Sequence, residues 1–455
     1  MMNWLKYSLV LCLLTGLLAC QSSTKTKSGD IATRPQAGWL KNAVIYEVNI
    51  RQYTPQGTFN AFAKSLPRLK KLGVTILWLM PVNPISVKNR KGSLGSYYAV
   101  KNYKKINPEF GTLDDFKNLV NEAHQMGFKV IIDWVANHTG WDNSWIYSHP
   151  EWYKKDSTGA ICSPDPDWTD VAGLNYAVVP MRRAMISAMK YWLKTTDIDG
   201  FRCDAAWGVP QDFWEEARAS LDSIKPVYML AEDEDHPGFL KKAFESDYAW
   251  KFYHLMNDVA EGKKEASVFR TYFNHLGARY ARGSFPMQFI TNHDENSWTG
   301  TVRERLGKAA DAFSVLYFTV PGIPLIYSGQ EAGLSKRLRF FDKDTINWSD
   351  LSKQGFYRSL IQLKTENAAL WNGSAGGSLE LLSTSDNTHL FAFRRRKGSN
   401  EVMVILNLSD REIKGTVKAN VPNGFTEWNG TRTLPVGKNV VVKLGPWNYK
   451  IYSCR

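Results

Sequence analysis

The feature that most constrains the fold is a regular alternation, from Val44 onward, of short apolar runs and amphipathic segments of helical length. Runs of four to eight apolar residues are typical of strands buried on both faces. Eight strand-then-helix units predict a closed parallel (β/α)8 barrel, the TIM barrel, within residues 38–370. The runs cover residues 44–48, 75–82, 129–135, 200–206, 227–232, 248–253, 286–292 and 324–329, and the sixth is weak.

Helix boundaries can be read between these runs. Thr112 is followed three residues later by Asp115, and the amphipathic stretch that starts there continues to Met126 and stops at Gly127. A hydroxyl residue before a helix and a glycine after it are the usual capping residues. A second helix is expected from Pro180 to Thr196.

Two stretches depart from the repeat. Residues 136–180 separate the third strand from its helix and are rich in Trp, Asp, Ser and Pro. Such a length is unusual for a connection, so we expect a small inserted domain there. From about residue 375 to residue 455, short alternating segments are separated by turn residues and no long helix fits. This pattern predicts a C-terminal antiparallel β-sandwich domain.

The N-terminus has the pattern of an export signal. An apolar run from Leu9 to Ala19 follows Lys6, and the sequence becomes polar directly after Cys20. The run is short for a membrane span, so residues 1–19 are interpreted as a signal peptide. Residues 17–20, Leu-Leu-Ala-Cys, resemble a bacterial lipobox, in which cleavage leaves Cys20 to carry lipid. We therefore expect residues 20–37 to be a tether and the protein to be anchored to the cell envelope, at the outer membrane or cell surface. The alternative is that the protein is periplasmic or is secreted without an anchor.

Charge and cysteine content add little about function. The net charge is +13, but the Lys and Arg residues are scattered, and the longest basic run covers only residues 394–397. We interpret these residues as a solvated basic surface and predict no nucleic-acid partner. Beyond the signal and Cys20, three cysteines remain at irregular spacing, which does not indicate a disulfide framework. Of these, Cys203 lies in an apolar run and is expected to be a buried small residue.

Polar residues gather where four of the apolar runs end. In a (β/α)8 barrel the working side chains lie at the C-terminal ends of the strands. Four polar clusters on one rim bring like charges close together, which is unfavourable, so we expect these charges to have a function. The clusters follow the third, fourth, fifth and seventh strands and consist of Asp133 with Asn137 and His138, Arg202 with Asp204, Glu232, and Asn292 with His293 and Asp294.

Two of these carboxylates suit the hydrolysis of a glycoside with retention of configuration. That mechanism needs two carboxyls about 5–5.5 Å apart, one as nucleophile and one as acid and base. Asp204 and Glu232 follow neighbouring strands. Arg202 points to the same face as Asp204 and would keep it ionised. Asp294 would hold sugar hydroxyls and raise the pKa of Glu232.

The four segments resemble the four ordered signature regions of the alpha-amylase family, glycoside hydrolase family 13. They read DWVANH (133–138), GFRCDAA (200–206), MLAED (229–233) and ITNHDE (290–295). The resemblance covers roughly residues 40–455. It implies Asp204 as nucleophile, Glu232 as acid/base and Asp294 as transition-state stabiliser. It also implies substrate contacts from Arg202, His138 and His293, and a sugar stacked on Tyr98.

The chain departs from the family where calcium is concerned. Members usually carry a calcium-binding Asp in a short segment of the inserted domain, and the matching stretch 171–175 has Gly173 there. Asn137 and Asp170 remain as candidate ligands. Calcium takes six to eight oxygen ligands, and six cannot be assembled from the sequence. Calcium is therefore possible but doubtful, and no organic cofactor is expected.

Other departures concern the substrate. Ala99 follows Tyr98, where chain-end α-glucosidases of the family usually have Asp, and this favours cleavage within a chain. Trp207-Gly208 replaces a common Lys-His pair on the leaving-group side. Trp207 and Trp298 are candidate sugar contacts, although packing in the core is an equally good interpretation of each.

The sequence thus predicts a retaining hydrolase of α-1,4-glucosidic bonds in starch, maltooligosaccharides or related α-glucans. A neopullulanase-like or cyclomaltodextrinase-like hydrolase, or an α-glucan transglycosylase, is the alternative among enzymes. A non-catalytic glycan-binding lipoprotein is the alternative outside them, but such proteins typically lose the carboxylates. The oligomeric state stays open.

Overall fold

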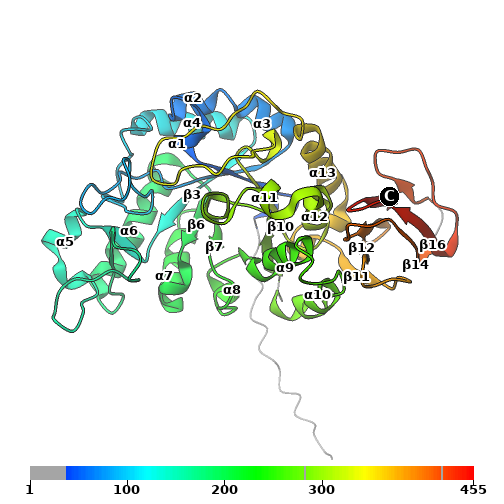
Figure 1. The fold of residues 1–455 in the computed structure, drawn as a ribbon. Coiled ribbons are helices and arrows are strands. Elements are labelled where there is room, and N and C mark those ends of the chain that lie inside the picture. The colour runs from blue at the N-terminus through cyan, green and yellow to red at the C-terminus, as the bar shows by residue number, and fades with distance from the viewer. Residues whose placement is uncertain (1–36, 281–282, 422–423, 455) are drawn as a thin grey trace, which may run out of the picture. The chain divides into compact units, whose positions relative to one another are not determined.

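The computed structural model describes residues 37–280, 283–421 and 424–454. Eight parallel strands close into a barrel in the order β1-β10-β9-β8-β7-β6-β3-β2, with helices around it (Figure 1), which confirms the predicted fold class. The barrel strands are β1 (Ile45–Val48), β2 (Ile76–Leu79), β3 (Lys129–Val135), β6 (Gly200–Asp204), β7 (Tyr228–Ala231), β8 (Ser246–Tyr248), β9 (Phe285–Gln288) and β10 (Ile323–Tyr327).

Side chains alternate between the barrel interior and the helix layer, as the pleat of a strand requires. Ile45, Ile131 and Leu230 belong to one buried cluster that fills the interior, whereas Val130 and Phe201 belong to the cluster between strands and helices. Two residues further toward the C-terminal ends of β1, β3 and β7 come the polar residues Glu47, Asp133 and Glu232. The interior is therefore apolar at its base and charged at its top.

The helix ends follow the capping residues. Thr112 and Asp115 form a reciprocal capping box at the start of α4, and Gly127 adopts φ +85° just after its end, as the sequence predicts. The helices that surround the barrel are α1 (Ile50–Tyr53), α2 (Phe59–Ala63), α3 (Leu66–Leu72), α4 (Leu113–Gln125), α6 (Val179–Thr196), α7 (Gln211–Asp222), α8 (Phe239–Lys242), α9 (Trp250–Ala260), α10 (Val268–Arg279), α11 (Val302–Leu306), α12 (Ala310–Thr319) and α13 (Gln354–Glu366).

The sixth barrel strand differs from its predicted position. The apolar run at 248–253 was expected to be the strand, but β8 ends at Tyr248 and α9 begins at Trp250. Phe252, Tyr253 and Met256 are buried on one side of that helix. Their spacing of three to four residues is helical, and the short, polar β8 carries no apolar run of its own.

Residues 136–180 form two short strands and two short helices between β3 and α6. β4 (His138–Gly140) pairs antiparallel with β5 (Val171–Gly173), and α5 (Ser144–Ser148) and η2 (Pro150–Trp152) lie in the connection. Trp152 is buried and Trp145 packs against it edge to face. These aromatic rings provide the small apolar core that such a short segment can build.

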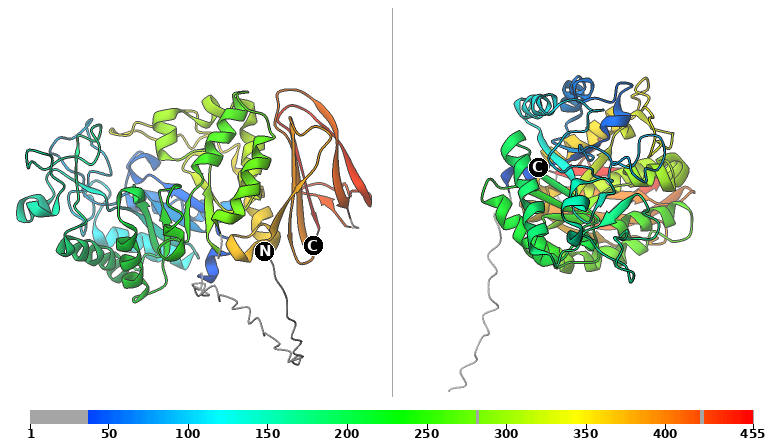
Figure 2. Two further views of the ribbon diagram at one scale, coloured as in Figure 1. Left: turned by 90° about the horizontal axis from the view of Figure 1, so that it is seen from below. Right: turned by 90° about the vertical axis from the view of Figure 1, so that its left-hand side faces the viewer.

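The C-terminal residues form two antiparallel sheets with a buried apolar cluster, as expected of a sandwich, coloured orange and red in Figure 2. One sheet has the order β11-β12-β13-β17-β15, and the other pairs β14 with β16. The strands are β11 (Ser378–Leu382), β12 (Leu390–Lys397), β13 (Asn400–Asn407), β14 (Ile413–Val421), β15 (Thr426–Glu427), β16 (Gly437–Leu444) and β17 (Tyr449–Cys454).

The basic run in β12 is not the solvated surface that the sequence suggested. Arg395 is 1% exposed and donates hydrogen bonds to the carbonyl oxygens of Thr319, Gly377 and Trp371. Arg394 is also buried. Because period-two alternation places neighbouring strand residues on opposite faces, a run of four cations in a strand necessarily sends some of them inward. Arg395 thereby joins the C-terminal sheet to the end of α12.

The predicted signal peptide, Cys20 and tether residues up to 36 lie outside the described residues. In the part of the chain that is described, no helix combines the length and apolar character needed to cross a membrane.

Candidate active site

The barrel brings the predicted polar clusters together at the C-terminal ends of β3, β6, β7 and β9. In the register of the sheet, Val135 lies beside Asp204, and Cys203 beside Ala231. The backbone N–H of Glu232 donates to the carbonyl of Cys203 at 3.0 Å. Glu232 therefore lies one position beyond the end of β7, next to Asp204 at the end of β6.

Arg202 connects the carboxylates. Its Nη1 lies 2.9 Å from Asp133 Oδ1 and 3.1 Å from Asp204 Oδ1, and its Nη2 lies 2.8 Å from Glu232 Oε1. Its Nε donates to the Tyr248 hydroxyl at 3.0 Å. The guanidinium is fully buried. Asp204 and Glu232 are thus held against one rigid cation, as the spacing of Arg202 and Asp204 on one strand face predicts.

Asp133 is the most deeply buried carboxylate that contacts Arg202. It is fully buried and accepts hydrogen bonds from the Tyr98 hydroxyl at 3.0 Å and from Trp78 Nε1 at 3.3 Å, in addition to its contact with Arg202. Each of its oxygens thus has a donor, which a buried carboxylate requires. Asp133 positions both Arg202 and Tyr98.

His293 links the opposite side of the barrel. Its Nδ1 lies 2.5 Å from Glu47 Oε1, and its Nε2 lies 2.7 Å from the Tyr98 hydroxyl and 3.2 Å from Asp294 Oδ2. The Asp294 and Glu47 carboxylates raise the pKa of His293 well above its ordinary value, although burial acts in the opposite direction. A charged imidazolium donates from both nitrogens, which fits these contacts. Glu47 was not predicted as part of the site.

Burial and charge shift the three carboxyls differently. Burial raises the pKa of Asp204 well above its ordinary value, the Glu232 carboxylate raises it further, and Arg202 opposes both. Burial also raises the pKa of Glu232, with Arg202 opposing and Asp294 adding to the rise. Burial alone would raise the pKa of Asp294, but the neighbouring His293 brings it below its ordinary value. Asp294 raises the pKa of Glu232, as predicted, but burial contributes more to that rise.

The backbone after Asp204 is bent into a conformation that residues with a Cβ rarely adopt. Ala205 has φ +41° and ψ +46°, and its N–H donates to Glu232 Oε2 at 2.7 Å. Left-handed backbone at a residue other than glycine is strained and is often found at functional sites. The turn directs the backbone N–H of Ala205 at Glu232, and this contact could not be predicted from the sequence.

A cavity of about 520 Å³ opens above these groups. Asp204, Glu232, Asp294, Tyr98 and His138 line it, together with the predicted Trp207 and Trp298. The two tryptophans are 53% and 54% exposed, so both point into open space and neither is core packing. His138 is buried, which lowers its pKa to about 3 and keeps the ring neutral.

Further aromatic residues of this cavity were not identified from the sequence. Trp168, expected among the aromatics of the inserted segment, lines the cavity with its ring centroid 6.4 Å from that of Trp207. Phe340 and Phe341 lie beside Trp298, with centroids 5.1 and 5.6 Å from its ring. The cavity therefore has one group of aromatic rings at Trp207 and another at Trp298.

The predicted calcium ligands make other contacts. Asn137 Nδ2 lies 3.4 Å from His138 Nδ1, and a Cβ on Gly208 would come within 2.6 Å of Asn137 Oδ1. Asp170 forms an ion pair with Lys91 at 3.3 Å. The described residues contain no group of three or more His, Cys, Asp or Glu side chains placed to hold a metal ion. Calcium ligands also include amide and backbone carbonyl oxygens, so binding at Asn137 and Asp170 stays a prediction.

The raised pKa of Asp204 predicts that removing its charge stabilises the protein. At neutral pH the carboxyl is ionised in the unfolded chain, whereas the folded site disfavours that ionised form. We expect Asp204→Asn to raise the midpoint of thermal unfolding by a few degrees at pH 7. The gain should fall as the pH approaches about 4 and vanish near about pH 3, where the carboxyl is protonated in both states. Calorimetry across this range, with exposed Asp410→Asn as control, measures it. If the unfolding midpoint of Asp204→Asn at pH 7 is unchanged or lower, the pKa of Asp204 is not raised in the folded protein.

Comparison with known proteins agrees with this geometry. A family model described as "Alpha amylase, catalytic domain" matches residues 23–159 and 166–368. Alpha-amylase 3 of Dictyoglomus thermophilum is 27% identical, over 90% of this chain and 93% of that protein. Alpha-amylase MalA of Haloarcula japonica is also 27% identical, over 84% of this chain but only 58% of that longer protein.

The solved structures include a similar fold. A noncanonic maltogenic alpha-amylase, AmyB, from Thermotoga neapolitana is 30% identical, with a TM-score of 0.83, over 91% of this chain and 99% of that one. The family model alone covers well over half of the sequence, and its span includes all four polar clusters of the site. The chain belongs to the alpha-amylase family of glycoside hydrolases.

Proposed function

We propose that the protein hydrolyses α-1,4-glucosidic bonds in starch, maltooligosaccharides or related α-glucans with retention of configuration. The observation that carries the proposal is the pair Asp204 and Glu232, joined by one buried guanidinium at the base of an open cavity. Two carboxyls on neighbouring strand ends, both bound to one guanidinium, suit the nucleophile and the acid/base that a covalent glycosyl intermediate requires.

In the first step Asp204 attacks the anomeric carbon and forms an ester bond with it. Glu232 gives its proton to the glycosidic oxygen, so the bond from that oxygen to the anomeric carbon breaks and the leaving sugar departs as an alcohol. In the second step Glu232 takes a proton from water, the water oxygen bonds to the anomeric carbon, and the carboxylate of Asp204 is released. Burial raises the pKa of both carboxyls, so the pair retains a proton, and in the proposed mechanism that proton is on Glu232 and Asp204 is ionised.

Asp294 and the two histidines have binding roles in this proposal. The lowered pKa of Asp294 keeps it ionised, so it can accept hydrogen bonds from sugar hydroxyls and stabilise positive charge that develops on the sugar ring. Neutral His138 lines the cavity and can donate to a sugar hydroxyl. Both nitrogens of His293 are engaged with Glu47, Tyr98 and Asp294, so His293 acts on the sugar through Tyr98 and Asp294 instead of contacting it directly. Tyr98 is held in position by Asp133 and His293, which suits a ring on which the sugar stacks.

Cleavage within a chain is favoured over trimming of chain ends. The cavity has exposed tryptophans at two places, Trp207 and Trp298. Aromatic faces stack on the apolar faces of sugars, so the two groups could hold sugars on both sides of the cleaved bond. Ala99 adds no charge beside Tyr98 to hold a chain end. A neopullulanase-like or cyclomaltodextrinase-like hydrolase, or a transglycosylase, uses the same carboxylates and remains the alternative.

The roles of the carboxyls can be tested with azide. We expect Asp204→Ala and Glu232→Ala each to lower kcat on maltooligosaccharides by at least about a thousandfold. With an α-glucosyl donor that has a good leaving group, Glu232→Ala should still form the ester, and azide should then give the α-glucosyl azide. In Asp204→Ala, azide should replace the nucleophile and give the β-anomer. NMR of the products distinguishes the two, and full activity of either variant would refute the mechanism.

The substrate proposal predicts a role for the exposed tryptophan at the rim. Trp298→Ala should raise KM for amylose about two- to tenfold with a smaller change in kcat, because stacking contributes roughly 0.5–1.5 kcal/mol to binding. Tyr147, which is 68% exposed in the inserted segment and outside the cavity, provides the matched control as Tyr147→Ala. Product analysis on amylose, pullulan and cyclodextrin should show long oligosaccharides first from amylose. Products released only as single sugars from chain ends would overturn internal cleavage.

We also propose that the protein is exported and held at the cell envelope by lipid on Cys20. Metabolic labelling with an alkyne fatty acid should label the wild type in its native host and leave Cys20→Ala unlabelled and released from the membrane fraction. Cys12→Ala is the control, because Cys12 lies within the segment expected to be removed, and its labelling should persist. Equal labelling of wild type and Cys20→Ala would disprove the anchor.

A further inference from the structure

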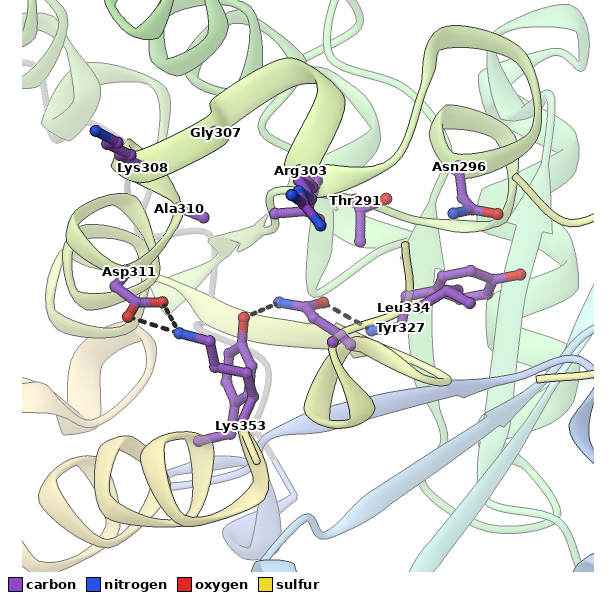
Figure 3. Close-up of a pocket in the computed structure, with 14 residues that line it drawn as sticks. Thr291, Asn296, Arg303, Gly307, Lys308, Ala310, Asp311, Tyr327, Leu334 and Lys353 are labelled. Atoms are coloured by element: carbon purple, nitrogen blue, oxygen red, sulfur yellow. Dashed lines mark hydrogen bonds and ion pairs between the residues drawn. The ribbon is translucent and has the colours of Figure 1, made fainter. Parts of the chain in front are cut away.

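A second cavity, of about 570 Å³, lies apart from the catalytic carboxyls, between the segments that follow β9 and β10. Residues of α11, α12 and α13 complete its lining, and Figure 3 shows their side chains around one space. Val302, Ala310 and Leu334 supply apolar surface. The volume is typical of sites for small molecules, which are mostly apolar with a few convergent polar groups.

The buried polar groups of this cavity differ in whether they have hydrogen-bond partners. Gln330 Nε2 donates to the Tyr357 hydroxyl at 2.7 Å, and Gln330 Oε1 accepts from the backbone N–H of Tyr327 (Figure 3). Thr291, however, is 3% exposed and its hydroxyl has no hydrogen-bond partner. A buried hydroxyl without a partner costs free energy, so it marks a place where a ligand could supply one.

The charges around the cavity are unbalanced. Lys353 is neutralised by Asp311, since its Nζ lies 2.8 Å from both carboxylate oxygens. Arg303 and Lys308 line the same cavity from α11 and the turn after it, and among the described residues neither has a carboxylate within ion-pair distance. Two uncompensated cations beside one apolar cavity favour an anion, and a guanidinium matches the geometry of phosphate oxygens.

We propose that this cavity binds a small phosphorylated sugar, with the phosphate at Arg303 and Lys308 and a sugar hydroxyl at Thr291. β9 and β10 are the seventh and eighth strands of the barrel in chain order. The loops after those two strands are where (β/α)8 barrels frequently bind phosphate. The sugar follows from the deep hydroxyl of Thr291, because inorganic phosphate bound at the two cations would leave it unpaired.

The proposed site adjoins the active site without sharing its catalytic groups. Thr291 and Asn296 line the second cavity, whereas Asp294 and Trp298, on the same segment, line the first. A ligand in the second cavity would thus contact the segment that carries Asp294. The proposal does not rest on the proposed hydrolysis, because binding can be measured without substrate turnover.

Isothermal titration of the wild-type protein with glucose 1-phosphate tests the site, with glucose and inorganic phosphate as separate arms. We expect glucose 1-phosphate to bind more tightly than either. The double variant Arg303→Gln/Lys308→Gln should weaken its binding at least about tenfold, since charged hydrogen bonds are the strongest contacts available there. Both side chains are exposed, so the variant should fold. The control Lys70→Gln/Lys71→Gln removes the same charge from the exposed face of α3 and should bind like wild type.

Thr291→Val separates the sugar from the phosphate. It removes the hydroxyl at nearly constant volume and should reduce the preference for glucose 1-phosphate over inorganic phosphate, without lowering thermal stability. Three results would overturn the proposal: no binding of glucose 1-phosphate to the wild type, equal loss of binding in both charge variants, or inorganic phosphate binding as tightly as glucose 1-phosphate.

Discussion

The active site depends on the burial of one cation, Arg202, among carboxylates. An isolated buried charge is very costly, so a buried guanidinium needs carboxylates around it. Here Asp133, Asp204 and Glu232 surround a single guanidinium. The carboxylates outnumber the cation, which, together with burial, explains why the pKa values of Asp204 and Glu232 are both raised. The same arrangement fixes the ends of β3, β6 and β7 relative to one another.

A chain of hydrogen bonds extends this arrangement across the barrel. Asp133 contacts Tyr98, Tyr98 contacts His293, and His293 reaches Glu47 at the end of β1 and Asp294 beyond β9. Strands far apart in sequence are therefore coupled through buried polar groups. Such networks are rigid when satisfied, which suits a site whose carboxyls must keep a fixed separation. Closure of the barrel is what brings Glu47 within reach of His293.

The sequence predicted the parts of this structure that depend on local pattern. Apolar runs gave seven of the eight strands near their observed positions, and the polar residues at strand ends gave the carboxylates. β8 was displaced because it is short and polar, and the adjacent apolar run belongs to a helix. Arg395 was assigned to the surface because a run of cations does not reveal which of them meet free carbonyls. Glu47, Phe340 and the turn at Ala205 depend on contacts between distant segments, which no local pattern reports.

The floor and the rim of the cavity have different origins, and this separates chemistry from specificity. The floor consists of residues at the ends of barrel strands, whose positions follow from the hydrogen-bond register of the sheet. The rim consists of aromatic residues on connections, namely Trp168 in the inserted segment, Trp207 after β6, and Trp298 and Phe340 in the long connections after β9 and β10. Loops tolerate substitution better than a closed barrel does. On the proposed function, substrate preference would depend on the aromatic residues of the rim, and the reaction on the charged floor and the burial of Arg202.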